Sequence, residues 1–142
     1  MAADAQTMSY GPSISLENAK KAAAPAIAEA RKNNWTMVVA IVDTAGDLVY
    51  LERMDDTQVG SVDVALSKGR SAARFKRPTK AFQDALAAGG EGLRILALQG
   101  AVPVDGGVPL VMGGKIVGAI GVSGGTSAQD GQVAAAGVAA IK

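Results

Sequence analysis

The chain has 142 residues, which is the size of one domain with its own hydrophobic core. Its 14 lysine and arginine residues nearly balance 13 aspartate and glutamate residues, and this balance argues against a specialised polyanion-binding protein. Cysteine and histidine are absent, so disulfides, thiolate chemistry and haem ligation by these two residues are excluded.

The first residues give no sign of a targeting segment. Residues 1–13 lack both the cationic start and the apolar core of an export signal, and no run approaches the roughly 20 residues of a membrane span. We therefore expect a cytoplasmic protein, with a loose lead-in over residues 1–13 and a single domain over residues 14–142.

The first predicted helix begins after Ser15, a residue type that caps helix N-termini, and ends near residues 33–34. Pro25 removes one backbone hydrogen bond and predicts an interruption with a kink. A β-hairpin follows, with apolar strands over residues 37–43 and 48–54 joined by a polar turn.

Two further helices are predicted over residues 61–75 and 78–88, the second opened by Pro78 and stopped by two glycines. Residues 91–105 are ambiguous, because their apolar run fits either a helical turn or a strand. Pro103 favours an extended segment there.

The C-terminal part is rich in glycine. The pair Gly113 and Gly114 supplies the positive φ angles of a tight turn between two apolar strands. Residues 123–127, the glycine loop, then lead into the last helix, with Ser127 as its predicted N-cap and Asp130 completing a capping box. Backbone N–H groups at such a helix start can receive an anion. Hairpins flanked by helices predict an α+β domain with an antiparallel sheet.

Three phrases of the sequence together resemble the GlcG/HbpS-like family, also called the haem-degrading domain family. They are AIVDTAGDLVYLERMDD at residues 40–56, GGVPLVMGGKIVGAIGVSGG at residues 106–125 and QDGQVAAAGVAAI at residues 129–141. The resemblance implies a profilin-like antiparallel sheet of about five strands covered by helices, and oligomers that are octameric in several members. Two departures are the pair Asp130-Gly131, where an acidic pair is usual, and the absence of histidine.

The candidate site residues lie at the end of the second predicted strand, on the predicted helix over residues 61–75 and in the glycine loop. A surface salt bridge and a core methionine would explain Arg53, Met54 and Asp55 as well as a site does. In a site, Arg53 would hold a carboxylate in a bidentate fork, and Asp55 would orient the ligand or accept a proton. Lys68 is either a solvated helix lysine or a partly buried cation usable in acid–base chemistry. The residues predicted to bind the ligand are Arg53, Met54, Ser123, Gly124, Gly125 and Thr126.

The basic run over residues 68–80 has two interpretations. It could contact nucleic acid, but Phe75 alone offers a ring for base stacking and the overall charge is close to zero. A solvated face near a helix C-terminus explains it better, since cations are favourable there.

Haem iron has few candidate ligands in this chain. Proteins ligate it through histidine, cysteine, methionine or tyrosine, and only the last two are present. We predict no tight structural haem and no metal site, while haem without histidine or cysteine ligation stays open. The candidate ligands are Tyr50, Met54 and Met112, with Tyr10 more remote.

Three hypotheses of function follow. The first is a cofactorless lyase or isomerase of a catabolic pathway, in which Arg53 and the glycine loop hold a small acidic substrate while Asp55 and Lys68 transfer protons. The second is a non-catalytic module that binds or senses haem or a corrinoid through an apolar surface between subunits. The third is a structural subunit. The scarcity of large apolar side chains also predicts a homo-oligomer, because subunit contacts complete a limited core.

Overall fold

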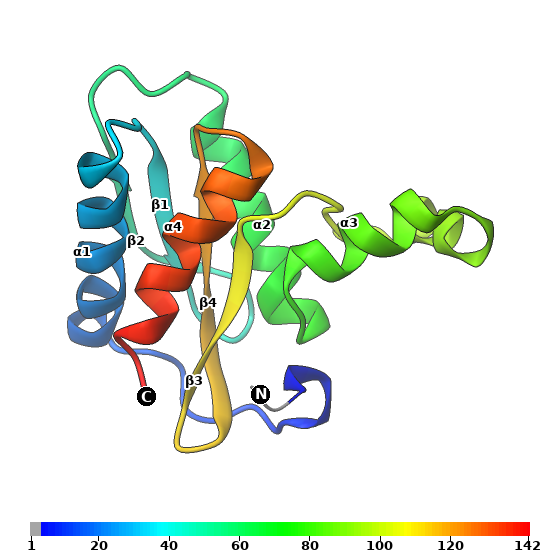
Figure 1. The fold of residues 1–142 in the computed structure, drawn as a ribbon. Coiled ribbons are helices and arrows are strands. Elements are labelled where there is room, and N and C mark those ends of the chain that lie inside the picture. Colours follow the sequence, from blue (N-terminus) through cyan, green and yellow to red (C-terminus); the bar gives the residue numbers. More distant parts are fainter. Residues whose placement is uncertain (1–3) are drawn as a thin grey trace.

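The computed structural model describes residues 4–142 and contains a four-stranded antiparallel sheet in the order β2-β1-β4-β3 (Figure 1). Helices α1 and α4 pack together over one face of the sheet, and α2 covers the other. The predicted α+β class is therefore confirmed, with four strands among the described residues instead of about five. The bounds are α1 (Leu16–Lys32), β1 (Val38–Val42), β2 (Leu48–Arg53), α2 (Ser61–Phe75), β3 (Gly107–Met112), β4 (Lys115–Ser123) and α4 (Ser127–Ala139).

The central strands β1 and β4 are buried on both faces, which explains why both are continuous apolar runs in the sequence. Strands β2 and β3 form the two edges of the sheet. Helix α1 begins at its predicted cap, where Asn18 N donates to Ser15 Oγ over 3.1 Å. It continues through Pro25, where the sequence predicted an interruption. Buried alanines on both sides of the proline hold the helix against the core, and a single backbone hydrogen bond is lost.

Helix α2 approaches the sheet closely because small residues face each other. A Cβ atom built on Gly121 of β4 would overlap the carbonyl oxygen of Ala65 and lie 2.6 Å from Gly69 N. A Cβ atom on Gly69 of α2 would lie 3.5 Å from its nearest neighbours, which is an ordinary contact distance. The helix therefore rests on the backbone of β4, and position 121 has no room for any side chain.

Helix α3 (Thr79–Ala88) and the 3-10 helix η2 (Gly90–Ala97) pack on each other and project from the sheet as an arm, residues 79–98 (Figure 1). The 3-10 helix occupies residues 91–97 of the segment 91–105 that the sequence left ambiguous. Three leucines of the arm are exposed, and Leu96 is 71% exposed. Clustered exposed apolar side chains mark interaction surfaces more often than single ones do. The exposed leucines are Leu93, Leu96 and Leu98.

Residues 9–14 run along β4 beyond the end of β1. Gly11 N donates to Ile116 O and Ile14 N donates to Val117 O, each over 2.8 Å. The hydroxyl of Tyr10 donates to Ala73 O over 2.6 Å. This part of the predicted lead-in is thereby attached to both β4 and α2. Within residues 4–142, no helix is both long and apolar enough to cross a bilayer.

Candidate functional site

Lys68 is a buried cation, only 1% exposed, on the face of α2 that packs against the sheet. Its Nζ donates to Asp130 Oδ2 over 2.8 Å and to Val122 O over 2.9 Å. The other carboxylate oxygen, Asp130 Oδ1, accepts from Gly125 N over 2.9 Å. One ion pair thus joins α2, the end of β4 and the first turn of α4 beside the glycine loop. Lys68 is therefore a buried cation and not a solvated helix lysine. Its role in proton transfer stays a prediction.

A second carboxylate, Asp105, approaches this pair from the segment before β3. A Cβ atom on Gly131 would lie 2.7 Å from Asp105 Cγ, so the glycine at this position leaves room for the carboxylate. Burial raises the pKa of Asp105, and it also raises the pKa of Asp130. The hydrogen bonds from Lys68 and Gly125 oppose the rise at Asp130, while the nearby charge of Asp105 adds to it. The cluster therefore carries two carboxylates around one buried ammonium group.

Helix α4 begins one residue earlier than predicted, with Thr126 as its N-cap. Gln129 N donates to Thr126 Oγ1 over 3.2 Å, and Thr126 N donates to Gln129 Oε1 over 3.0 Å. This capping box replaces the predicted one and releases Asp130 to bind Lys68. Because Gly125, Thr126 and Gln129 already donate their backbone N–H groups to side chains of the chain, few donors of the loop are left for a bound anion.

Ser123 and Gly124 pack inward at the end of β4. Ser123 Oγ donates to Ser61 Oγ of α2 over 3.0 Å. Gly124 has φ +146°, and a Cβ atom there would lie 2.8 Å from Met37 Cα. Both residues thus pack β4 against its neighbours, while the predicted contact of Ser123, Gly124, Gly125 and Thr126 with a ligand stays a prediction.

Arg53 lies in the same row across the sheet as the glycine loop. It is opposite Val38, and Val38 is opposite Ser123, which places Arg53 and Ser123 about 10 Å apart by two strand spacings. Arg53 is exposed, and among the described residues its side chain makes no hydrogen bond with the loop. Met54 is half-buried against the core on the α1 side.

Asp55 is exposed in the turn after β2, whereas Lys68 is buried. The structure does not bring these two predicted catalytic residues into contact, and the carboxylate beside Lys68 belongs to Asp130. The sequence did contain evidence that Asp130 is buried, because position 130 shares the inner face of α4 with Val133 and Gly137 at helical spacing. An acidic residue on the apolar face of a helix needs a buried partner.

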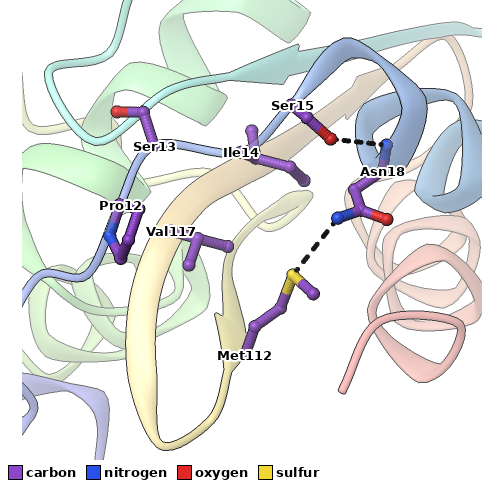
Figure 2. A pocket seen from close by; sticks show the side chains of 7 residues that line it. All are labelled: Pro12, Ser13, Ile14, Ser15, Asn18, Met112 and Val117. Atoms are coloured by element: carbon purple, nitrogen blue, oxygen red, sulfur yellow. Dashed lines mark hydrogen bonds between the residues drawn. The ribbon is translucent and has the colours of Figure 1, made fainter.

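Two apolar pockets flank the β3–β4 hairpin. The first, the Met112 pocket, has a volume of about 270 Å³ and lies between the hairpin and the start of α1 (Figure 2). In it, Asn18 Nδ2 donates to Met112 Sδ over 3.8 Å. The second, the β3-edge pocket, has a volume of about 400 Å³ and is lined by Asp4, Ala5, Met8, Pro78, Val108, Pro109, Val111 and Val138.

The two tyrosines are poor candidates for iron ligands. Tyr50 donates its hydroxyl to Glu52 Oε1 over 2.8 Å, and this hydrogen bond is the main cause that raises the pKa of Tyr50. Burial raises the pKa of Tyr10, whose hydroxyl also has an acceptor. A raised pKa disfavours the tyrosinate form that binds iron. Met8 and Met112 are the methionines that line the two apolar pockets, and Met8 was not singled out from the sequence.

Over the described range, no group of three or more acidic residues is arranged to hold a metal ion. Side chains of valine, proline and methionine dominate the lining of the β3-edge pocket, and such a lining suits an apolar ligand better than a free cation.

The sequence matches the family described as haem-degrading protein HbpS-like over residues 14–139. It is 39% identical over 119 residues to a 15.0 kDa protein from the dhaT-dhaS intergenic region of Citrobacter freundii. This alignment covers 82% of this chain and 84% of that protein. It is 38% identical over 95 residues to protein GlcG of Escherichia coli strain K12, covering 67% of this chain and 69% of GlcG.

Two solved structures are similar over nearly the whole chain. A double mutant of Streptomyces reticuli HbpS superposes with a TM-score of 0.84 at 30% identity, covering 100% of this chain and 96% of that chain. The complex of PduOC with haem superposes with a TM-score of 0.81 at 28% identity, covering 92% of this chain and 96% of that chain.

Proposed function

This chain belongs to the HbpS-like family of haem-degrading proteins, and from that membership we propose that it is a haem-binding module that holds the macrocycle without a histidine ligand. The observation that carries the proposal is the β3-edge pocket, an apolar cavity of about 400 Å³ beside the sheet edge formed by β3. Its volume lies within the range of about 300–1,000 Å³ that is usual for small-molecule sites.

The β3-edge pocket is formed by several anchored segments. Lys76 Nζ donates to Met8 O over 2.7 Å, which fixes the N-terminal wall beside the start of α3. Other parts of the lining come from β3 and from Val138 on α4. Pre-positioned walls reduce the entropy cost of ligand binding.

The residues present fit haem in one respect and exclude two kinds of iron ligand. An apolar macrocycle suits the valines and prolines of the pocket, and Met8 Sδ is the thioether in its lining. A histidine or thiolate ligand from this chain is impossible. Bound haem would supply a redox-active iron, while the chain would bind and orient the macrocycle. A second copy of the chain beside β3 would enlarge the site, in line with the hypothesis of a surface between subunits.

The relatives support this proposal better than a lyase or isomerase. That first hypothesis requires Asp55 and Lys68 in one site, and the structure separates the exposed carboxylate from the buried ammonium group. A small acidic substrate at Arg53 stays a prediction, as does the cytoplasmic location.

A charged residue in the β3-edge pocket is expected to weaken haem binding. Val111→Asp would place a carboxylate against the macrocycle, at a cost of about 1–3 kcal/mol. We expect the dissociation constant for haem to rise at least tenfold, measured by titration of the Soret band. Met8→Leu keeps the apolar volume but removes the thioether, so loss of a spectral shift with little loss of affinity would identify sulfur ligation.

Two controls accompany this titration. Val59→Asp makes the same change at a residue that is 84% exposed and outside both pockets, and it should leave haem affinity unchanged. Met112→Leu tests the Met112 pocket instead. Equal affinity of the wild type and Val111→Asp would rule out the β3-edge pocket, and a corrinoid titrated in parallel shows whether the site distinguishes the two macrocycles.

We also propose that the chain forms a homo-oligomer in which the arm contacts another copy. Leu96→Glu is expected to shift the protein toward smaller species in sedimentation velocity at micromolar concentration, because it places a charge in an apolar contact. Val59→Glu is the matched control on an exposed valine outside the arm. A wild-type monomer under these conditions would contradict the proposal.

A further inference from the structure

A third cavity lies on the outer side of α2, away from both apolar pockets. It has a volume of about 470 Å³ and is lined by Ser67, Arg70 and Arg74 of α2 and by residues 99–102. The segment opposite the helix is fixed, because Val102 N donates to Ser71 Oγ over 3.1 Å. Its lining contains two guanidinium groups and no carboxylate.

Both arginines are held in place by the turn between β1 and β2. Arg70 Nε donates to Gly46 O over 3.1 Å, and Arg74 Nε donates to Ala45 O over 2.8 Å. A guanidinium group has five N–H donors, so each arginine keeps four donors on its terminal nitrogens. Anchoring at Nε fixes the plane of each group before any ligand arrives, which lowers the entropy cost of a bidentate contact.

Neither charge is neutralised within the part of the chain that the structure describes. The ion pairs found there involve lysines and Arg94, and no carboxylate lies within 4.0 Å of Arg70 or Arg74. Positions 70 and 74 are also four residues apart on one helix, a spacing at which like charges repel. Two fixed, unpaired cations in a concave site concentrate positive potential there.

We propose that this cavity, the Arg70–Arg74 pocket, binds a small oxyanion, either a phosphate or a carboxylate. The planar fork of guanidinium donors matches the oxygens of both groups. The hydroxyl of Ser67 and the side-chain amide of Gln99 line the same pocket and add neutral hydrogen-bonding groups. A small anion fits this site better than a nucleic acid does, because the cations line a cavity rather than an extended surface. The site is separate from the proposed haem pocket.

The test is a titration of the intact protein with inorganic phosphate, and separately with succinate, at constant ionic strength. The backbone amides of the pocket and the Nε–Hε signals of the two arginines are followed by NMR. We expect saturable shifts confined to the pocket with at least one of the two anions. Arg70→Gln and Arg74→Gln should each raise the dissociation constant at least tenfold. Arg70→Lys should also weaken binding, since it keeps the charge but loses the fork.

Arg31→Gln is the matched control, because it removes one positive charge from an exposed residue at the end of α1. It should leave the dissociation constant unchanged, and thermal melting confirms that each variant is folded. Shifts that do not saturate, or an equal loss in Arg31→Gln, would overturn the proposal. If Arg70→Gln abolished haem binding as well, the pocket would belong to the haem site, and its independence would be refuted.

Discussion

Replacing Asp130 with alanine is expected to lower the free energy of unfolding by about 3–5 kcal/mol, because it leaves the ammonium group of Lys68 buried without a counter-charge. Lys68→Met should cost a similar amount by leaving Asp130 unpaired. The loss is measured by urea unfolding at a fixed protein concentration, with linear extrapolation to water. Asp130→Asn provides a milder variant, since its side-chain oxygen can still accept from Gly125 N.

Combining Lys68→Met with Asp130→Asn should restore much of the loss, because the double variant buries no charge. The two single effects should therefore fail to add by about 0.5–3 kcal/mol in a double-mutant cycle. The exposed pair Lys80 and Asp84 is the control, since its N···O distance of 2.9 Å is nearly the same as the 2.8 Å of the buried pair. Removing that pair should have no measurable effect, and additive losses at Lys68 and Asp130 would contradict our account.

Gly121→Ala is expected to destabilise the protein by about 3 kcal/mol or more, since overpacking usually costs about 1–3 kcal/mol and here the added methyl group meets backbone atoms that cannot move independently. The new Cβ would overlap Ala65 O and would force α2 away from β4. The effect is measured by the same urea titration, together with the slope of the transition.

The residue on the other side of this contact gives the opposite expectation. Gly69→Ala adds the same methyl group from the helix, where its nearest neighbours are 3.5 Å away. It should be neutral or stabilise by up to about 1 kcal/mol, because alanine is a better helix former than glycine. If the two variants had equal effects, the close approach at Gly121 would not limit the packing of α2.

Most of the fold could be predicted from local patterns. The bounds of α2 agree with the prediction over residues 61–75, and the hairpin around Gly113 and Gly114 lies where the glycine pair indicated it. Helix α3 of the arm also agrees with the helix predicted over residues 78–88, but the second half of the arm could not be predicted in the same way. In residues 91–105 most large apolar side chains are exposed and only Ile95 is buried, so neither helical nor strand periodicity identifies the structure of this segment.

The site was harder to predict, because its central contact joins residues far apart in the chain. Lys68 and Asp130 are 62 positions apart, and each has an ordinary local explanation, as a solvated helix lysine or as a capping residue. Only the packing of α2 and α4 against β4 shows that they form a pair. The Arg70–Arg74 pocket could not be predicted for the same reason, since it depends on where the turn between β1 and β2 lies against α2.

The exposed leucines of the arm have a thermodynamic consequence if they are covered by another copy. Contacts made only in the assembled state stabilise the fold by mass action, so dilution alone would lower the melting temperature. The stability of this chain would then be set partly by its abundance. Three leucines outside the core would make the folded state depend on the concentration of the protein itself.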